Sequence, residues 1–248
     1  MKKFLAALVV ALATTSASAW DLRTMNNHVD NTNFVLGGGC SATLISVTER
    51  LVLTNNHCIT KYLKIKPEDV ISDDGVVTSI RRYESSDVPL SQKKYDGTQT
   101  ISETIWLAKI LKRDAKRDLA LLQIRQEQVP FTISAKLYDG PELLRGETIY
   151  VVGNPLGVYD ASITKGIISS TTRQVKIGAT TFDYVQVDAG VIGGNSGGAL
   201  YNDDGLLVGV PAAALRGAET YGFAIPSTVV KEFIVGAGYK ELYEEVSE

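Results

Sequence analysis

A single serine in a glycine-rich segment is the most chemically suggestive feature of the sequence. The stretch at residues 191–200 reads VIGGNSGGAL, with four glycines around Ser196. Glycine destabilises the interiors of strands and helices, so such a cluster indicates a tight turn or a close backbone approach. A serine hydroxyl becomes an effective nucleophile only beside a base, most often histidine, that a third group orients. An ordinary loop explains this stretch equally well, so the rest of the chain must supply the base.

The sequence offers two histidines as the base. His28 lies in the polar segment MNNHVDN near the N-terminus, which indicates a surface segment and a poor candidate. His57 follows the apolar run RLVLTNN and directly precedes Cys58. We therefore expect its imidazole at the end of a strand. A lone histidine is more often structural, so this interpretation depends on Ser196 and on an acid.

Asp118 is the preferred acid, in the segment KRDLALLQI. It stands directly before an apolar run that is typical of a strand and can fix its position. Asp114, four residues earlier, is the alternative. Asp118 could equally be a water-exposed residue at the start of a strand.

The first residues indicate export. Lys2 and Lys3 precede an apolar run, and the small residues at 17–19 form a cleavage site before Trp20. This pattern predicts a signal peptide over residues 1–19 and one mature domain over residues 20–248. The apolar run is shorter than the roughly 20 residues that a membrane span needs, so we expect no stable membrane anchor.

Composition excludes several other classes of protein. The 248 residues carry a net charge of −3, without the basic excess of nucleic-acid-binding domains. Cys40 and Cys58 are the two cysteines, and in an exported chain such a pair favours a disulfide. Only His28 and His57 could join them in a zinc site, and the spacing is not that of a metal site. We expect neither a metal nor a cofactor.

Short runs rich in Val, Ile, Leu, Thr and Tyr predict an all-β body. The predicted strands are residues 42–47, 51–54, 119–124, 148–152, 163–169, 184–187 and 206–210. The turn signal at Asn202–Gly205 should join two strands as a hairpin. One helix is expected at the C-terminal end, with Ser227 as its N-cap and two glycines, Gly236 and Gly238, weakening its middle. The polar stretch at 61–117 is interpreted as part hairpin and part mobile surface loop.

The segments LTNNHC, RDLALLQI and GGNSGGAL, in this order, resemble the His, Asp and Ser motifs of trypsin-like serine peptidases. The segments VVGNPLGVYDASITKGIISS, GNSGGALYNDDGLLVGV and YGFAIPS are similar to the bacterial HtrA/Deg branch. The resemblance extends from Gly37 to about Phe233. It implies a chymotrypsin-like fold, with two six-stranded antiparallel β-barrels and the active site between them.

The resemblance also implies a role for each matching residue. Ser196 would be the nucleophile, His57 the general base and Asp118 the residue that orients the imidazole. The N–H groups of Gly194 and Ser196 would form the oxyanion hole. Cys40 and Cys58 match a structural disulfide found in many members.

Two departures from the wider family bear on mechanism. Asn195 precedes the serine where digestive enzymes have an aspartate that pairs with a new N-terminus. We therefore expect activity that requires no cut beyond removal of the signal peptide. The chain also resembles a protease domain without the PDZ domains that usually follow it in HtrA/Deg proteins.

The position six before the serine, at the base of the S1 pocket in this fold, is Gly190 rather than an acid. Pro211, Ala212 and Ala213 would supply small apolar walls, so we expect a preference for aliphatic P1 residues. A shift in the register of the loop would instead bring Asp188 into the pocket and favour Arg or Lys.

Together these features predict a periplasmic or secreted bacterial serine endopeptidase that acts on proteins or peptides, unfolded ones included. The alternative is an inactive peptidase-fold protein that serves as a binding module. An esterase of another fold is less compatible, because GGNSGG is not the G-x-S-x-G elbow. The sequence does not predict an oligomeric state.

Overall fold

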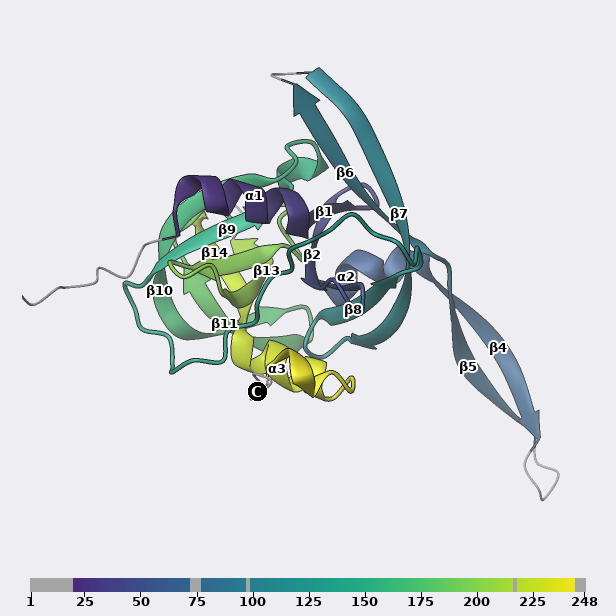
Figure 1. Cartoon of the computed structure of the whole chain (residues 1–248). Helices are drawn as coiled ribbons and strands as arrows, with labels where there is room; N and C mark the ends of the chain where they lie inside the picture. Colours follow the sequence, from purple (N-terminus) through teal and green to yellow (C-terminus); the bar gives the residue numbers. More distant parts are fainter. Residues whose placement is uncertain (1–19, 72–76, 97–98, 216–217, 244–248) are drawn as a thin grey trace, which may run out of the picture.

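The computed structural model describes residues 20–71, 77–96, 99–215 and 218–243 (Figure 1). Its body consists of two closed six-stranded barrels whose neighbouring strands are antiparallel. The predicted all-β class and the two-barrel architecture are therefore confirmed. The predicted signal peptide, residues 1–19, lies outside the described residues.

The first barrel has the strand order β1-β2-β3-β8-β7-β6. Its strands are β1 (Asn33–Leu36), β2 (Cys40–Ser46), β3 (Leu51–Thr54), β6 (Val88–Asp96), β7 (Gln99–Asp114) and β8 (Leu119–Ile124). The sequence predicts β3 and β8 with these same bounds.

The second barrel has the strand order β10-β11-β14-β13-β12-β9. Its strands are β9 (Thr148–Gly153), β10 (Ser162–Ile177), β11 (Thr180–Val187), β12 (Ala199–Asn202), β13 (Leu207–Leu215) and β14 (Ala218–Pro226). The predicted turn at Asn202–Gly205 joins β12 to β13. Gly205 has a φ of +74°, and its N–H donates to the carbonyl of Asn202 at 3.1 Å.

Strands β3 and β8 read as continuous apolar runs because both of their faces are buried. On β8, Leu119 and Leu121 belong to a cluster that also contains Tyr150 and Tyr201 of the second barrel. Leu122, on the opposite face, belongs to the interior of the first barrel. The two strands thus lie between the core of the first barrel and the apolar interface between the barrels.

The segment at 61–117 contains more strand than the sequence predicts. β4 (Leu63–Ile71) and β5 (Val77–Ser85) form a separate two-stranded sheet that projects from the body (Figure 1). β6 and β7 pair as a second long hairpin and complete the first barrel. The prediction of a surface loop for part of this segment is wrong, since polar residues on the exposed parts of hairpins hide the alternation that marks a strand.

Helix α1 (Leu22–Thr32), purple in Figure 1, is not predicted from the sequence. Asp21 caps it by accepting hydrogen bonds from the N–H groups of Arg23 and Thr24 at 3.0 and 3.1 Å. Its buried residues are Met25, His28, Val29 and Thr32, which have the i, i+3, i+4, i+7 spacing of one helical face. The assignment of His28 to a surface segment is therefore wrong, because most of the helix is polar and its buried face is narrow.

The C-terminal helix is shorter than predicted. α3 spans Ser227–Val235, and Pro226 rather than Ser227 occupies the N-cap position. The helix ends at the two glycines, where Gly238 has a φ of +95°. The other helices are short: α2 (Asn56–Ile59) and the 3-10 helices at Thr60–Tyr62, Pro155–Gly157 and Lys240–Leu242. No helix among the described residues has both the length and the apolar character that a membrane span requires.

Candidate active site

His57 and Asp118 meet at the end of the first barrel. His57 lies in α2, directly after β3, and Asp118 lies in the turn before β8, the neighbour of β3. One carboxylate oxygen of Asp118 lies 2.7 Å from Nδ1 of His57, and the other accepts the His57 N–H at 2.9 Å. The side chain of Asp118 is 12% exposed, whereas that of His57 is 47% exposed. The carboxylate therefore holds the ring from the protein side and leaves its other edge accessible.

The turn before β8 gives Asp118 an unusual backbone conformation. Its φ is +55°, a left-handed value that aspartate tolerates better than most residues. Its carbonyl accepts hydrogen bonds from the Asn56 N–H at 3.1 Å and from Asn55 Nδ2 at 2.9 Å. The alternative acid, Asp114, instead accepts from the N–H groups of Lys116 and Arg117. Asp114 therefore stabilises the turn and makes no contact with His57 among the described residues.

The glycine-rich segment at residues 192–198, around Ser196, is called the serine loop below. The disulfide between Cys40 and Cys58 lies between His57 and this loop. Cys58 Sγ is 3.6 Å from His57 Nε2 and 3.7 Å from the carbonyl oxygen of Ser196. The two sulfurs and the imidazole lie within 4.8 Å of one another, but oxidised cysteines offer no thiolate to a metal.

The hydroxyl of Ser196 donates to the carbonyl of Ala212 at 3.4 Å. Within the described part of the chain, no hydrogen bond joins it to His57. Contacts between nucleophile and base are often looser in the absence of substrate and tighten when it binds.

The residues before Ser196 form a turn that matches the prediction for this glycine-rich stretch. The Asn195 N–H donates to the carbonyl of Ile192 at 3.1 Å, and Gly194 has a φ of +104°. A positive φ at the third turn position but not at the second, Gly193, is that of a type II turn, and it favours glycine. A Cβ on Gly194 would lie 2.3 Å from the carbonyl oxygen of Asn154, so only glycine fits. The N–H groups of Gly194 and Ser196 have no acceptor among the residues that the structure describes.

Gly190 lies beside the serine loop, because Asn195 Nδ2 donates to its carbonyl at 3.2 Å. A Cβ built on Gly190 meets only Thr164 Cγ2, at 3.8 Å, so space remains there.

The other predicted S1 residues lie on β13. The carbonyl of Pro211 accepts the Gly197 N–H at 3.0 Å, and that of Ala212 accepts the Ser196 hydroxyl. Ala213 pairs with Phe223 of β14. Asp188 accepts the N–H of Ile167 on β10 at 2.7 Å, so one of its oxygens is already bound there.

His28 lies apart from these residues, on the buried face of α1, where it belongs to an aromatic cluster. Its ring packs edge-on against Trp20 and Tyr201, and Nε2 is 3.3 Å from the Tyr201 hydroxyl. Burial lowers the pKa of His28 to about 4, so the ring is neutral at neutral pH.

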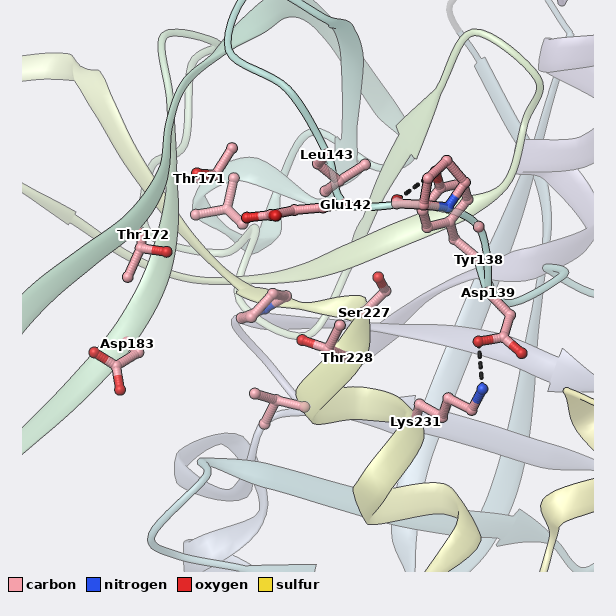
Figure 2. Close-up of a pocket in the computed structure, with 15 residues that line it drawn as sticks. Tyr138, Asp139, Glu142, Leu143, Thr171, Thr172, Asp183, Ser227, Thr228 and Lys231 are labelled. Carbon is pink, nitrogen blue, oxygen red and sulfur yellow. Dashed lines mark hydrogen bonds and ion pairs between the residues drawn. The ribbon is translucent and has the colours of Figure 1, made fainter.

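A cavity of about 480 Å³ lies on the second barrel, at the start of α3 (Figure 2). Figure 2 shows the ion pair between Lys231 and Asp139 on one of its sides. None of the predicted catalytic, oxyanion-hole or S1 residues lines this cavity.

The fold and the site define a chymotrypsin-like double barrel, in which a disulfide lies between an Asp–His pair and a glycine-rich serine loop. Residues 40–210 match the family described as trypsin-like peptidase domain, and the chain belongs to this family.

Curated relatives are serine proteases of the HtrA and DegP type. The chain is 39% identical over 144 residues to the serine protease Do-like HtrA of Bacillus subtilis, covering 55% of this chain and 30% of that protein. It is 32% identical over 195 residues to the periplasmic serine endoprotease DegP of Escherichia coli, covering 77% and 34%. The chain thus spans about a third of the length of these relatives.

Solved structures with the same fold include the HtrA-type protease AlgW with a decapeptide, at a TM-score of 0.58 and 26% identity over 80% of this chain and 51% of that one. The protease domain of MamO from Magnetospirillum magneticum matches at a TM-score of 0.62, covering 83% and 97%. At 19% identity, this second likeness concerns the fold alone.

Proposed function

We propose that the protein is a serine endopeptidase with His57, Asp118 and Ser196 as its catalytic triad. The observation that carries this proposal is the double contact between Asp118 and His57, beside a serine loop whose Gly194 and Ser196 N–H groups find no acceptor in the described part of the chain. Membership of the trypsin-like peptidase family supports the same conclusion.

The contact with Asp118 determines the tautomer of His57. A carboxylate 2.7 Å from Nδ1 keeps the proton on that nitrogen, so Nε2 carries the lone pair. Nε2 would accept the hydroxyl proton as Ser196 Oγ attacks the substrate carbonyl, and would then return it to the leaving amine. A water molecule, activated by the same nitrogen, would hydrolyse the acyl-enzyme.

The N–H groups of Gly194 and Ser196 would stabilise the negative charge on the carbonyl oxygen during both steps. Losing one donor of this kind typically lowers turnover about 100-fold or more.

Small or medium aliphatic P1 residues are the proposed preference, because Gly190 carries no charge and Pro211, Ala212 and Ala213 are small. The peptide in the AlgW structure and the protease names of the relatives support protein or peptide substrates. The signal-peptide pattern and the periplasmic relatives support export to the periplasm. N-terminal sequencing of the exported protein should start at Trp20.

The experiment that tests the function is digestion of casein by the purified mature chain, with the cleavage sites identified by mass spectrometry. Wild type and the control Ser170→Ala should cleave after aliphatic residues, whereas Ser196→Ala should not cleave. Absence of cleavage by wild type, or equal cleavage by Ser196→Ala, would instead favour a binding module with a peptidase fold.

A further inference from the structure

Four consecutive carbonyls around the serine, those of residues 193–196, all accept hydrogen bonds. The carbonyls of Gly193 and Asn195 accept the N–H groups of Leu156 and Gly198, at 2.6 and 3.0 Å. The carbonyls of Gly194 and Ser196 both accept hydrogen bonds from a single residue, Ser41 of β2. Its hydroxyl donates to Gly194 at 2.7 Å and its N–H to Ser196 at 2.8 Å.

This arrangement determines where the loop's N–H groups point. The N–H and C=O of a trans peptide point in opposite directions. Binding the Gly193 and Asn195 carbonyls therefore directs the N–H groups of Gly194 and Ser196 away from Leu156 and Gly198. Ser41 binds the other two carbonyls, those of Gly194 and Ser196. Rotation of any one of these four peptide groups would therefore break a hydrogen bond.

Ser41 is itself held by a fully buried asparagine in the loop after β9. The N–H and Nδ2 of Asn154 donate to Ser41 Oγ at 2.8 and 3.0 Å, which orients the hydroxyl proton toward Gly194. Nδ2 also donates to the Phe34 carbonyl at 2.7 Å. Asn154 Oδ1 accepts hydrogen bonds from Asn33 Nδ2 and from the Ala161 N–H, both at 2.8 Å. The network thus joins both barrels to the serine loop.

From these contacts we infer that Ser41 and Asn154 are positioning residues that hold the oxyanion hole in its active shape. The inference rests on the proposed function and extends it to residues that touch no substrate. A buried hydrogen-bond network whose members are satisfied by one another rigidifies its surroundings, and loss of one member leaves the others unpaired. Preformed donors also cost no reorganisation during the reaction.

The test compares Ser41→Ala with a matched control, Thr43→Val. Thr43 lies two residues away on the same strand and is equally buried, but its hydroxyl has no partner among the described residues. Both variants delete a buried hydroxyl, so general effects of the substitution on β2 are shared.

Two measurements are made on each protein. Hydrogen exchange of a peptide covering residues 191–199 reports the order of the loop without requiring activity. Steady-state kinetics use a fluorogenic peptide copied from the casein site that wild type cleaves fastest. Ser41→Ala should accelerate exchange in the loop and lower kcat about 10- to 100-fold, with KM changed less than about threefold. Thr43→Val should behave as wild type.

Unchanged exchange, or unchanged kcat, in Ser41→Ala would overturn the inference. An inactive wild type with faster exchange in Ser41→Ala would overturn the proposed peptidase function but leave the positioning of the loop supported. If Ser41→Ala does not fold, the variant Asn33→Ala tests the inference in its place. It removes one hydrogen-bond donor to Asn154, at a position farther from the serine loop than Ser41. A smaller loss of kcat at constant KM supports the inference, and unchanged kcat overturns it.

Discussion

Asp118 binds His57 twice, once through the ring nitrogen Nδ1 at 2.7 Å and once through the backbone N–H at 2.9 Å. The two residues are 61 positions apart in the sequence and come together because β3 pairs with β8. The double contact fixes both the position of the ring and the nitrogen that carries its proton.

Asp118→Asn should lower kcat by about 10⁴-fold, because an amide that donates to Nδ1 favours the wrong tautomer. The measurement is kcat with the fluorogenic peptide, together with circular dichroism to check folding. Asp114→Asn is the control, since that carboxylate contacts the turn at residues 116–117 and not the imidazole. Equal losses in both variants would remove Asp118 from its proposed role.

Gly190 offers a direct test of the S1 assignment. The side chain in Gly190→Asp has room, because the nearest atom to the new Cβ is 3.8 Å away. A carboxylate at the base of the pocket should shift cleavage toward P1 Lys and Arg. The isosteric variant Gly190→Asn, which adds no charge, should not. The readout is the cleavage-site profile of casein, and a P1 profile that is the same in all three proteins would show that Gly190 does not line S1.

The disulfide should contribute to stability chiefly by restricting the unfolded chain. Cys40 and Cys58 are 18 positions apart in the sequence, for which chain entropy gives about 3 kcal/mol. The double variant Cys40→Ala/Cys58→Ala should lower the free energy of unfolding by this amount in urea titrations. Reduced wild type serves as the control, because reduction breaks the disulfide without replacing the two side chains. A loss under about 1 kcal/mol would contradict the expectation.

Titration of His28 should make the protein less stable in acid. Burial lowers its folded-state pKa to about 4, whereas the unfolded histidine titrates near 6.5. As pH falls below about 6.5 the unfolded chain takes up a proton that the folded chain does not, so stability falls until about pH 4. The total loss attributable to His28 is about 3 kcal/mol.

The measurement for His28 is urea unfolding between pH 7.5 and 4, in wild type and in His28→Leu. Other titrating groups are common to both proteins, so the difference between the two pH profiles isolates the histidine. Parallel profiles would show that His28 is not buried in its neutral form.

Local patterns were sufficient for the strands that carry the chemistry. β3 and β8 are apolar on both faces and bounded by polar residues, so their bounds follow from the sequence. The sequence predicts the hairpins at 61–117 only in part, because their exposed, charged residues obscure the alternation. The sequence does not predict α1, because its buried face consists of Met25, His28, Val29 and Thr32 in an otherwise polar segment.

The network around Ser41 and Asn154 had no local signal at all. Ser41 lies in a buried strand, and Asn154 lies in a loop 113 residues away. Their hydrogen bonds exist only because β2 and the end of β9 approach the same serine loop.

The sequence by itself determined the chemical groups of the candidate site, their order along the chain, and the glycines that permit the turn before Ser196, because residue type and backbone freedom are local properties. Tertiary structure alone decided which acid reaches His57, that His28 is buried, and which residues hold the carbonyls of the serine loop. These contacts join residues that lie far apart in the sequence and meet only when the two barrels close and pack together. No short stretch of sequence specifies them.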